Sequence, residues 1–212
     1  MIVNQVYMTL ESSAYSPMVR SKYQFLSNYL TLFISDLMKK KQINLGRFNR
    51  IVFQEGAKYD MCTVGDRAYC VNLTNEFRGL EFFSNENEVH RYFIRKYFEG
   101  FKKIDQEFKT ELVAELEETI EKQFKLAIYY DVKSKQFANY GYLIFRYRYN
   151  SFQLVAQCSR GDKNIGLEKV LYECEPDPFK VHHDIHKITV DNGEVIITGL
   201  LNENIGTFTF PI

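Results

Sequence analysis

The sequence predicts an α+β protein with antiparallel strands. Two observations support this prediction: helical spacing of apolar residues is concentrated before residue 125, and from Tyr140 onward the apolar residues alternate with a period of two. Tight turns also join the later strands, which favours hairpins over a doubly wound sheet. The chain has no linker rich in Pro, Gly and Ser and no internal repeat, so residues 1–212 are expected to form a single domain.

The first element is a helix over residues 17–40. Ser16 is a suitable N-cap, Pro17 suits the first turn, and the run 39–41 of three lysines complements the negative end of the helix dipole. The apolar residues at alternating steps of four and three form one buried stripe: Val19, Tyr23, Leu26, Leu30, Phe33 and Leu37.

Residues 50–73 are predicted to form a short antiparallel meander. Gly65 and Asp66 fit a two-residue turn that sets Val64 opposite Arg67. Gly56 and Ala57 would make a similar turn upstream. The sequence therefore predicts three short strands here.

The central part of the chain is predicted to be helical. Asn85 with Glu88 forms a sequence similar to a capping box, and a stripe of apolar residues continues as far as Phe124. Gly100 interrupts this stripe. The region is therefore either one long bent helix or two helices.

Two hairpins and a closing strand at 206–210 are predicted to form a C-terminal antiparallel sheet. Their turns are at residues 150–151 and at residues 192–193, where Asn-Gly is the stronger turn signal. The registers that these turns imply are Tyr149 opposite Phe152 and Tyr147 opposite Leu154 in the first hairpin, and Val190 opposite Val195 and Ile188 opposite Ile197 in the second.

The total charge is zero, because 27 basic residues balance 27 acidic ones. A nucleic-acid-binding protein usually carries a basic excess, so nucleic acid is disfavoured as a partner. The charge is unevenly distributed, however: residues 1–50 hold seven basic and two acidic residues, and residues 151–212 hold five and nine. Such asymmetry suits either self-association into a homo-oligomer or internal neutralisation.

The sequence predicts a cytoplasmic protein that does not enter membranes. The most apolar stretch, residues 25–38, is interrupted by polar residues and is shorter than the roughly 20 apolar residues that a spanning helix needs. The four cysteines include no Cys-x-x-Cys pair. The predicted meander places Cys62 and Cys70 on opposite faces, so the thiols are expected to be reduced.

Signatures of catalysis are absent, so we expect no cofactor and favour a protein that is not an enzyme. The chain has no phosphate loop, dinucleotide turn, nucleophile elbow or His-Glu-x-x-His motif. One cluster offers an alternative. His182, Asp184 and His186 would point to the same side of an extended segment, a spacing that would suit a divalent metal ion and a small metal-assisted hydrolase.

Three surfaces are candidates for binding a partner: an aromatic segment, an acidic helix face and the outer face of a strand. Each also has a structural interpretation, respectively a loop packed on the core, a solvated helix and a sheet packed against a helix. The third surface alternatively suits stacking of RNA bases. The aromatic segment comprises Phe77, Leu80, Phe82 and Phe83. The acidic helix face comprises Glu111, Glu115 and Glu118, and the strand face comprises Tyr142, Arg146 and Arg148.

The sequence thus favours a non-catalytic protein-binding module. An inhibitor or a toxin-neutralising immunity protein is the specific form of this hypothesis, with the metal-assisted hydrolase as its alternative.

Overall fold

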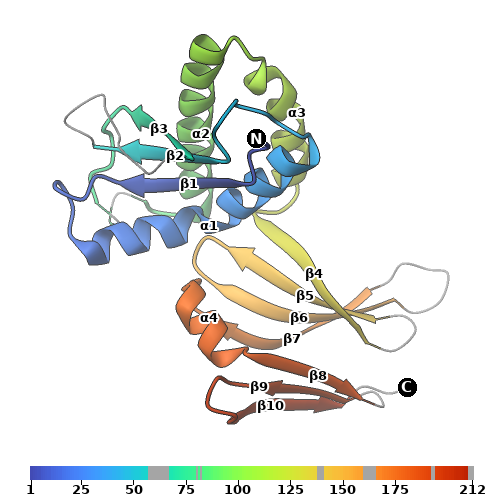
Figure 1. The fold of residues 1–212 in the computed structure, drawn as a ribbon. Helices are drawn as coiled ribbons and strands as arrows, with labels where there is room; N and C mark the ends of the chain where they lie inside the picture. The colour runs from blue at the N-terminus through green and yellow to red at the C-terminus, as the bar shows by residue number, and fades with distance from the viewer. Residues whose placement is uncertain are drawn as a thin grey trace. The chain divides into compact units, whose positions relative to one another are not determined.

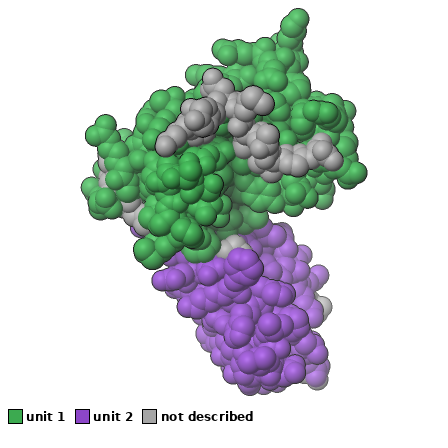
Figure 2. Space-filling view, turned by 60° about the vertical axis from the view of Figure 1, so that its left-hand side comes forward, with its two compact units in different colours: residues 1–128 green, residues 129–212 purple. Residues whose placement is uncertain are grey.

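The computed structural model describes residues 1–56, 67–79, 81, 83–137, 141–159, 166–191 and 194–209. It confirms the α+β class. The chain divides into two compact units, residues 1–128 and residues 129–212, which Figure 2 colours separately. The single domain that we expected from the missing linker stays a prediction, and each unit is described by itself below.

Unit 1 is built on a parallel sheet of three strands, in the order β1 (Gln5–Leu10), β2 (Arg50–Glu55) and β3 (Ala68–Leu73). The strand arrows point the same way in Figure 1. The predicted antiparallel meander is therefore wrong for β2 and β3, which pair in parallel with Phe53 beside Val71. Residues 57–66, which hold the predicted turn at Gly65 and Asp66 and all but Gly56 of the upstream turn, lie outside the described residues.

Helix α1 (Pro17–Lys40) has the predicted bounds. The Ser16 hydroxyl accepts a hydrogen bond from the Val19 amide, and Lys39 and Lys40 occupy the last turn. The helix returns the chain to the end of the sheet where β1 began, so β2 starts at the same edge and runs in the same direction.

The central helical region is two helices, α2 (Glu86–Phe108) and α3 (Leu112–Phe124). The start similar to a capping box is confirmed, because Asn85 Oδ1 accepts from the Glu88 amide. The Glu88 carboxylate accepts in turn from the amide of Ser84, one residue before the N-cap. The break lies at Lys109, which has a left-handed φ of 53°, and α2 continues through Gly100.

The helices cover one face of the parallel sheet. The buried strand residues alternate onto that face, and the Phe53 ring meets the rings of Tyr97 and Phe101 from α2. Tyr7, on the opposite face, is 42% exposed. A core of aromatic and aliphatic side chains thus fixes α1 and α2 over β2.

Unit 2 consists of two antiparallel sheets and a short helix. The predicted antiparallel pairing of the C-terminal strands is confirmed, although the strands form two sheets and not one. Core side chains come from both sheets, with Leu143, Leu154 and Leu171 from one and Val195 and Ile197 from the other. The first sheet holds β4 (Tyr129–Phe137), β5 (Gly141–Arg148), β6 (Phe152–Ser159) and β7 (Gly166–Cys174). The second holds β8 (Lys187–Asp191), β9 (Glu194–Thr198) and β10 (Asn204–Thr209). Helix α4 (Pro178–Asp184) lies between the two sheets in the sequence.

The second hairpin has the predicted register, with Val190 beside Val195. The register of the first differs by two residues, since Tyr147 and not Tyr149 is opposite Phe152. The Arg148 amide donates to the Ser151 carbonyl at 2.8 Å, which moves the two-residue turn back by one position. Because a two-residue shift preserves the alternation, the predicted inward face is unchanged.

Cys70 is disulfide-bonded, so the reduced state that we expected for it is wrong. The expectation rested on an antiparallel hairpin, whereas β3 pairs with β2 in parallel. Cys174 is a free thiol. Among the helices that the structure describes, none is both long enough and apolar enough to cross a bilayer.

Candidate functional site

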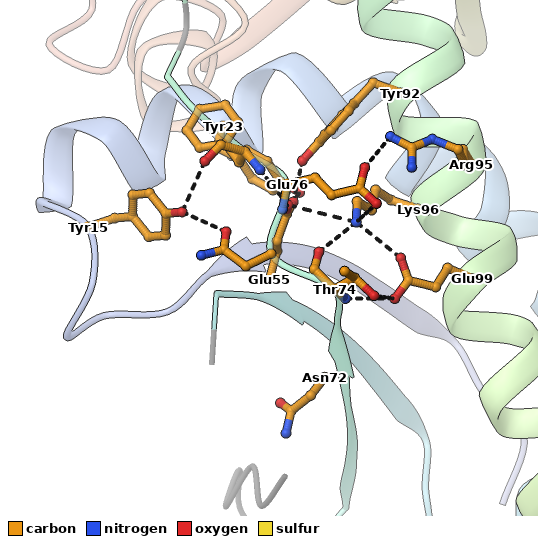
Figure 3. A network of polar contacts seen from close by, with 12 residues as sticks. Tyr15, Tyr23, Glu55, Asn72, Thr74, Glu76, Tyr92, Arg95, Lys96 and Glu99 are labelled. Atoms are coloured by element: carbon orange, nitrogen blue, oxygen red, sulfur yellow. Dashed lines mark hydrogen bonds and ion pairs between the residues drawn. The ribbon is translucent and has the colours of Figure 1, made fainter. Parts of the chain in front are cut away.

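The densest cluster of ionisable groups lies at the carboxyl end of β2 and β3 (Figure 3). Glu55 is the last residue of β2 and follows Ile51 and Phe53 on the covered face of the strand. Its side chain is fully buried. In open parallel sheets this edge is where ligands usually bind, so the cluster is a candidate site.

The Glu55 carboxylate accepts hydrogen bonds from three segments of unit 1. One oxygen accepts from the Phe77 amide at 2.7 Å and the Glu76 amide at 2.5 Å. The other accepts from the hydroxyl of Tyr23 at 2.8 Å and from that of Tyr92. Burial, followed by the neighbouring Glu55 charge, raises the pKa of Tyr23 well above its usual value. Glu55 therefore connects α1, α2 and the segment after β3.

Lys96 is the cation at the centre of the cluster, and its ammonium group is also fully buried. The Nζ atom donates to the Thr74 carbonyl at 2.6 Å and to Glu99 at 3.0 Å. It lies 3.5 Å from Glu76 and 3.8 Å from Glu55. Three carboxylates and a carbonyl thus surround a single ammonium group.

The outer carboxylates have further partners. Glu76 pairs with Arg95, and the hydrogen bond from Arg95 lowers the pKa of Glu76. Burial acts to raise the pKa of Glu99, but hydrogen bonds from Thr74 and Lys96 outweigh it, and the pKa is lowered. The amide and hydroxyl of Thr74 donate to Glu99 at 2.6 and 2.9 Å.

This geometry holds three segments of unit 1 together. Glu55 and Lys96 are both inaccessible to solvent, and their polar atoms have partners within the chain. Across the part of the chain that the structure describes, no group of three or more metal-ligating residues forms a site.

The sequence did not identify this cluster, because its members come from a strand, a loop and a helix. A signal was nevertheless present. Glu55 alternates with Ile51 and Phe53, and Lys96 lies three residues after Phe93 and one before Tyr97 on the buried stripe of α2. A charge at a core position of each element requires a partner.

The predicted aromatic segment is packed inward where the structure describes it. Phe77 is 4% exposed, and its ring contacts those of Tyr15, Tyr23 and Phe83. Phe77 is therefore not available as an anchor for a partner. Leu80 and Phe82 lie outside the described residues.

The predicted acidic stripe forms the outer face of α3, where Glu111, Glu115 and Glu118 are exposed. None of the three makes an ion pair with a described residue, and none is needed to cap the helix by its side chain. The Asp105 carboxylate instead accepts from the Leu112 amide at 2.7 Å. In the described part of the chain, these three carboxylates therefore face solvent without an ion-pair partner.

The predicted strand face is largely committed to contacts within unit 2. Arg146 is 8% exposed, donates to Asp131 and Glu168 at 2.8–3.0 Å, and stacks over the Tyr129 ring. The prediction that Arg146 is free for a partner is wrong, because carboxylates on β4 and β7 saturate its guanidinium. Tyr142 is 38% exposed and lies under Lys133, and Arg148 is half-buried.

The predicted metal-binding spacing is wrong, because His182 and Asp184 belong to helix α4 and not to an extended segment. Asp177 caps this helix by accepting from the Phe179 amide at 2.8 Å. Asp184 accepts from the Tyr172 hydroxyl and contacts His183, while the rings of His182 and His186 lie 5.7 Å apart. Among the described residues, the three predicted ligands do not form a group that could hold a metal ion.

The chain matches no known protein-family model, no curated protein and no solved structure.

Proposed function

We propose that this protein is a non-catalytic protein-binding module that presents the acidic face of α3 to a basic partner. The observation that carries the proposal is that Glu111, Glu115 and Glu118 are exposed and unpaired in the described structure. Aligned charges on a rigid helix accelerate association with a surface of opposite charge.

The rigidity of α3 supports this role. Its inner residues Leu112, Leu116 and Ile120 are at most 2% exposed, and Asp105 holds the first turn through the Leu112 and Val113 amides. The outer carboxylates therefore project from a backbone that is fixed before a partner arrives, which reduces the entropy lost on binding.

An inhibitor or toxin-neutralising immunity protein is the specific form of this proposal. Such a protein needs rapid capture of a basic surface and no chemistry of its own. The saturated contacts of Glu55 and Lys96 agree with that requirement. Cytoplasmic location and homo-oligomerisation stay predictions.

The test is quantitative capture of partners from a lysate of the source organism, with the full chain as bait. The triple variant E111K/E115K/E118K is compared with E173K/E175K/D191K, which changes the net charge equally at exposed positions of unit 2. Captured proteins are then purified and their affinity for each variant is measured at low and high salt.

The proposal predicts a specific protein that binds the wild type and the control variant, with binding to the α3 variant weakened about tenfold or more at low salt. Equal recovery by all three baits would remove the acidic face from the proposal. If the captured protein is an enzyme, suppression of its activity by the wild type supports the inhibitor form.

A further inference from the structure

Unit 1 carries a second charged surface, of opposite sign, at the amino-terminal edge of its parallel sheet. Six cationic side chains are exposed there, and we call this surface the basic edge. Its members are Lys39, Lys40, Lys41, Arg47, Arg50 and Arg67.

The fold brings these residues together from three segments. Lys41 is the C-cap of α1, and the connection that follows crosses the edge, where the Ile43 carbonyl accepts from the Val3 amide at 2.8 Å. Arg50 begins β2 and Arg67 immediately precedes β3. The Arg50 amide donates to the Arg67 carbonyl at 3.2 Å, which places these two residues side by side.

Among the described residues, no carboxylate is paired with the basic edge. Between Asp36 and Glu55 the chain has five basic residues and no acidic residue. None of the six cations forms an ion pair with a carboxylate in the described parts of the chain. The Arg47 guanidinium lies 5.2 Å from the centre of the Phe48 ring, and that ring packs against Tyr69.

The geometry points to the phosphate backbone of a nucleic acid as the ligand of the basic edge. Guanidinium groups match phosphate oxygens in pairs, and lysines add charge without demanding a fixed geometry. Lysine supplies half of the edge, whereas it is depleted in protein–protein interfaces, so phosphate is favoured over an acidic protein. Contacts of this kind are independent of base sequence.

The zero net charge does not oppose this inference, because unit 1 separates its charges. Glu55, Glu76 and Glu99 lie at the carboxyl ends of β2 and β3, the opposite edge from Arg50 and Arg67. A local field of one sign is enough to attract a polyanion within about a Debye length of 10 Å. The inference is independent of the protein-binding role of α3.

The experiment measures fluorescence anisotropy of labelled single-stranded RNA and duplex DNA of mixed sequence, titrated with the full chain at about 50 and 200 mM salt. Two variants each remove three of the six charges of the basic edge: R47Q/R50Q/R67Q and K39Q/K40Q/K41Q. The control K22Q/K122Q/K125Q removes the same charge from three other exposed positions. Lys22 lies near the start of α1, Lys122 lies in the last turn of α3, and Lys125 is the C-cap of α3.

The wild type is expected to bind in a salt-dependent way, and each edge variant is expected to bind about tenfold more weakly at the lower salt with a shallower salt dependence. The control is expected to stay within about twofold of the wild type. If circular dichroism shows the arginine variant to be unfolded, the lysine variant decides. The inference is overturned by no salt-dependent binding, by an equal loss in the control, or by polyglutamate competing as well as nucleic acid at equal charge.

Discussion

Lys96 shows how a single residue fixes the candidate site. Its ammonium is fully buried among Glu55, Glu76 and Glu99. Replacing it by Met leaves the buried Glu55 carboxylate without its cation, and removing one partner of such a pair costs about 3 to 5 kcal/mol. We expect K96M to lower the free energy of unfolding by about this amount, measured by urea denaturation.

Lys103 provides the matched comparison on the same helix. It pairs with Glu99 at 3.4 Å, but its side chain is 46% exposed. Exposed pairs contribute at most about 1 kcal/mol, so K103M should be close to neutral. Equal losses in the two variants would contradict the central position that we assign to Lys96.

His90 should make the stability of unit 1 sensitive to acid. Its Nδ1 lies 2.9 Å from the Tyr29 hydroxyl, and burial lowers its pKa from 6.5 to about 4. The folded state therefore binds fewer protons than the unfolded state between these values. Stability from the neutral imidazole is complete above pH 6.5 and is lost as the pH falls toward 4.

The corresponding test is urea denaturation of the wild type and H90Q from pH 7 to pH 4.5, about the range set by the two pKa values. Gln cannot take up a proton but can accept from Tyr29. Because His90 is only partly buried, we expect the wild type to lose about 1 kcal/mol more than H90Q over this range. Parallel pH profiles would show that protonation of His90 does not lower the free energy of unfolding.

At the scale of elements, Gly100 sets the distance between α2 and β2. A Cβ atom at this position would lie 2.2 Å from Cε1 of Phe53. Ala favours a helix over Gly by about 1 kcal/mol, but overpacking costs about 1 to 3 kcal/mol. We expect G100A to lower stability in thermal unfolding, although it improves helix propensity.

The second-site variant F53L tests the contact directly. Leu removes the ring atoms that the new methyl group would meet, so G100A should cost less in the F53L background than in the wild type. If the effects of the two substitutions on stability are additive, the destabilisation by G100A does not arise from contact with Phe53.

The elements that the sequence predicted well are those with local signals. Ser16, Pro17 and the lysines at 39–41 fixed the bounds of α1, and the Asn85 capping box fixed the start of α2. The direction of β2 relative to β3 has no local signal, because Glu55 at the end of β2 and Ala68 at the start of β3 are far apart in the sequence. Parallel pairing depends on the end of the sheet to which a connection returns the chain, which periodicity does not specify.

The predicted binding surfaces were correct only in part for the same reason. Exposed helix faces follow from helical spacing, so Glu111, Glu115 and Glu118 were placed correctly on the surface. Buried contacts between distant segments do not follow from spacing. Arg146 alternates as an outward residue, yet Asp131 and Glu168 enclose it from two other strands.

For the whole molecule, the division into two units predicts that stability is lost separately in each. Unit 1 is held by the contacts of Lys96 and Glu55, whereas Ile197 is fully buried in the core of unit 2. K96M and I197A each remove core contacts of one unit, and Ile→Ala in a core costs about 2 to 5 kcal/mol. Hydrogen exchange followed by mass spectrometry reports on peptides of each unit.

We expect K96M to accelerate exchange in peptides from residues 1–128 and I197A to do so in peptides from residues 129–212, because each substitution acts on a separate core. Under the single domain predicted from the missing linker, either substitution would accelerate exchange throughout the chain. The Lys103→Met variant, which changes an exposed side chain, should leave both sets of peptides unchanged. Faster exchange in both units from either core substitution would therefore contradict separate unfolding and establish one cooperative domain.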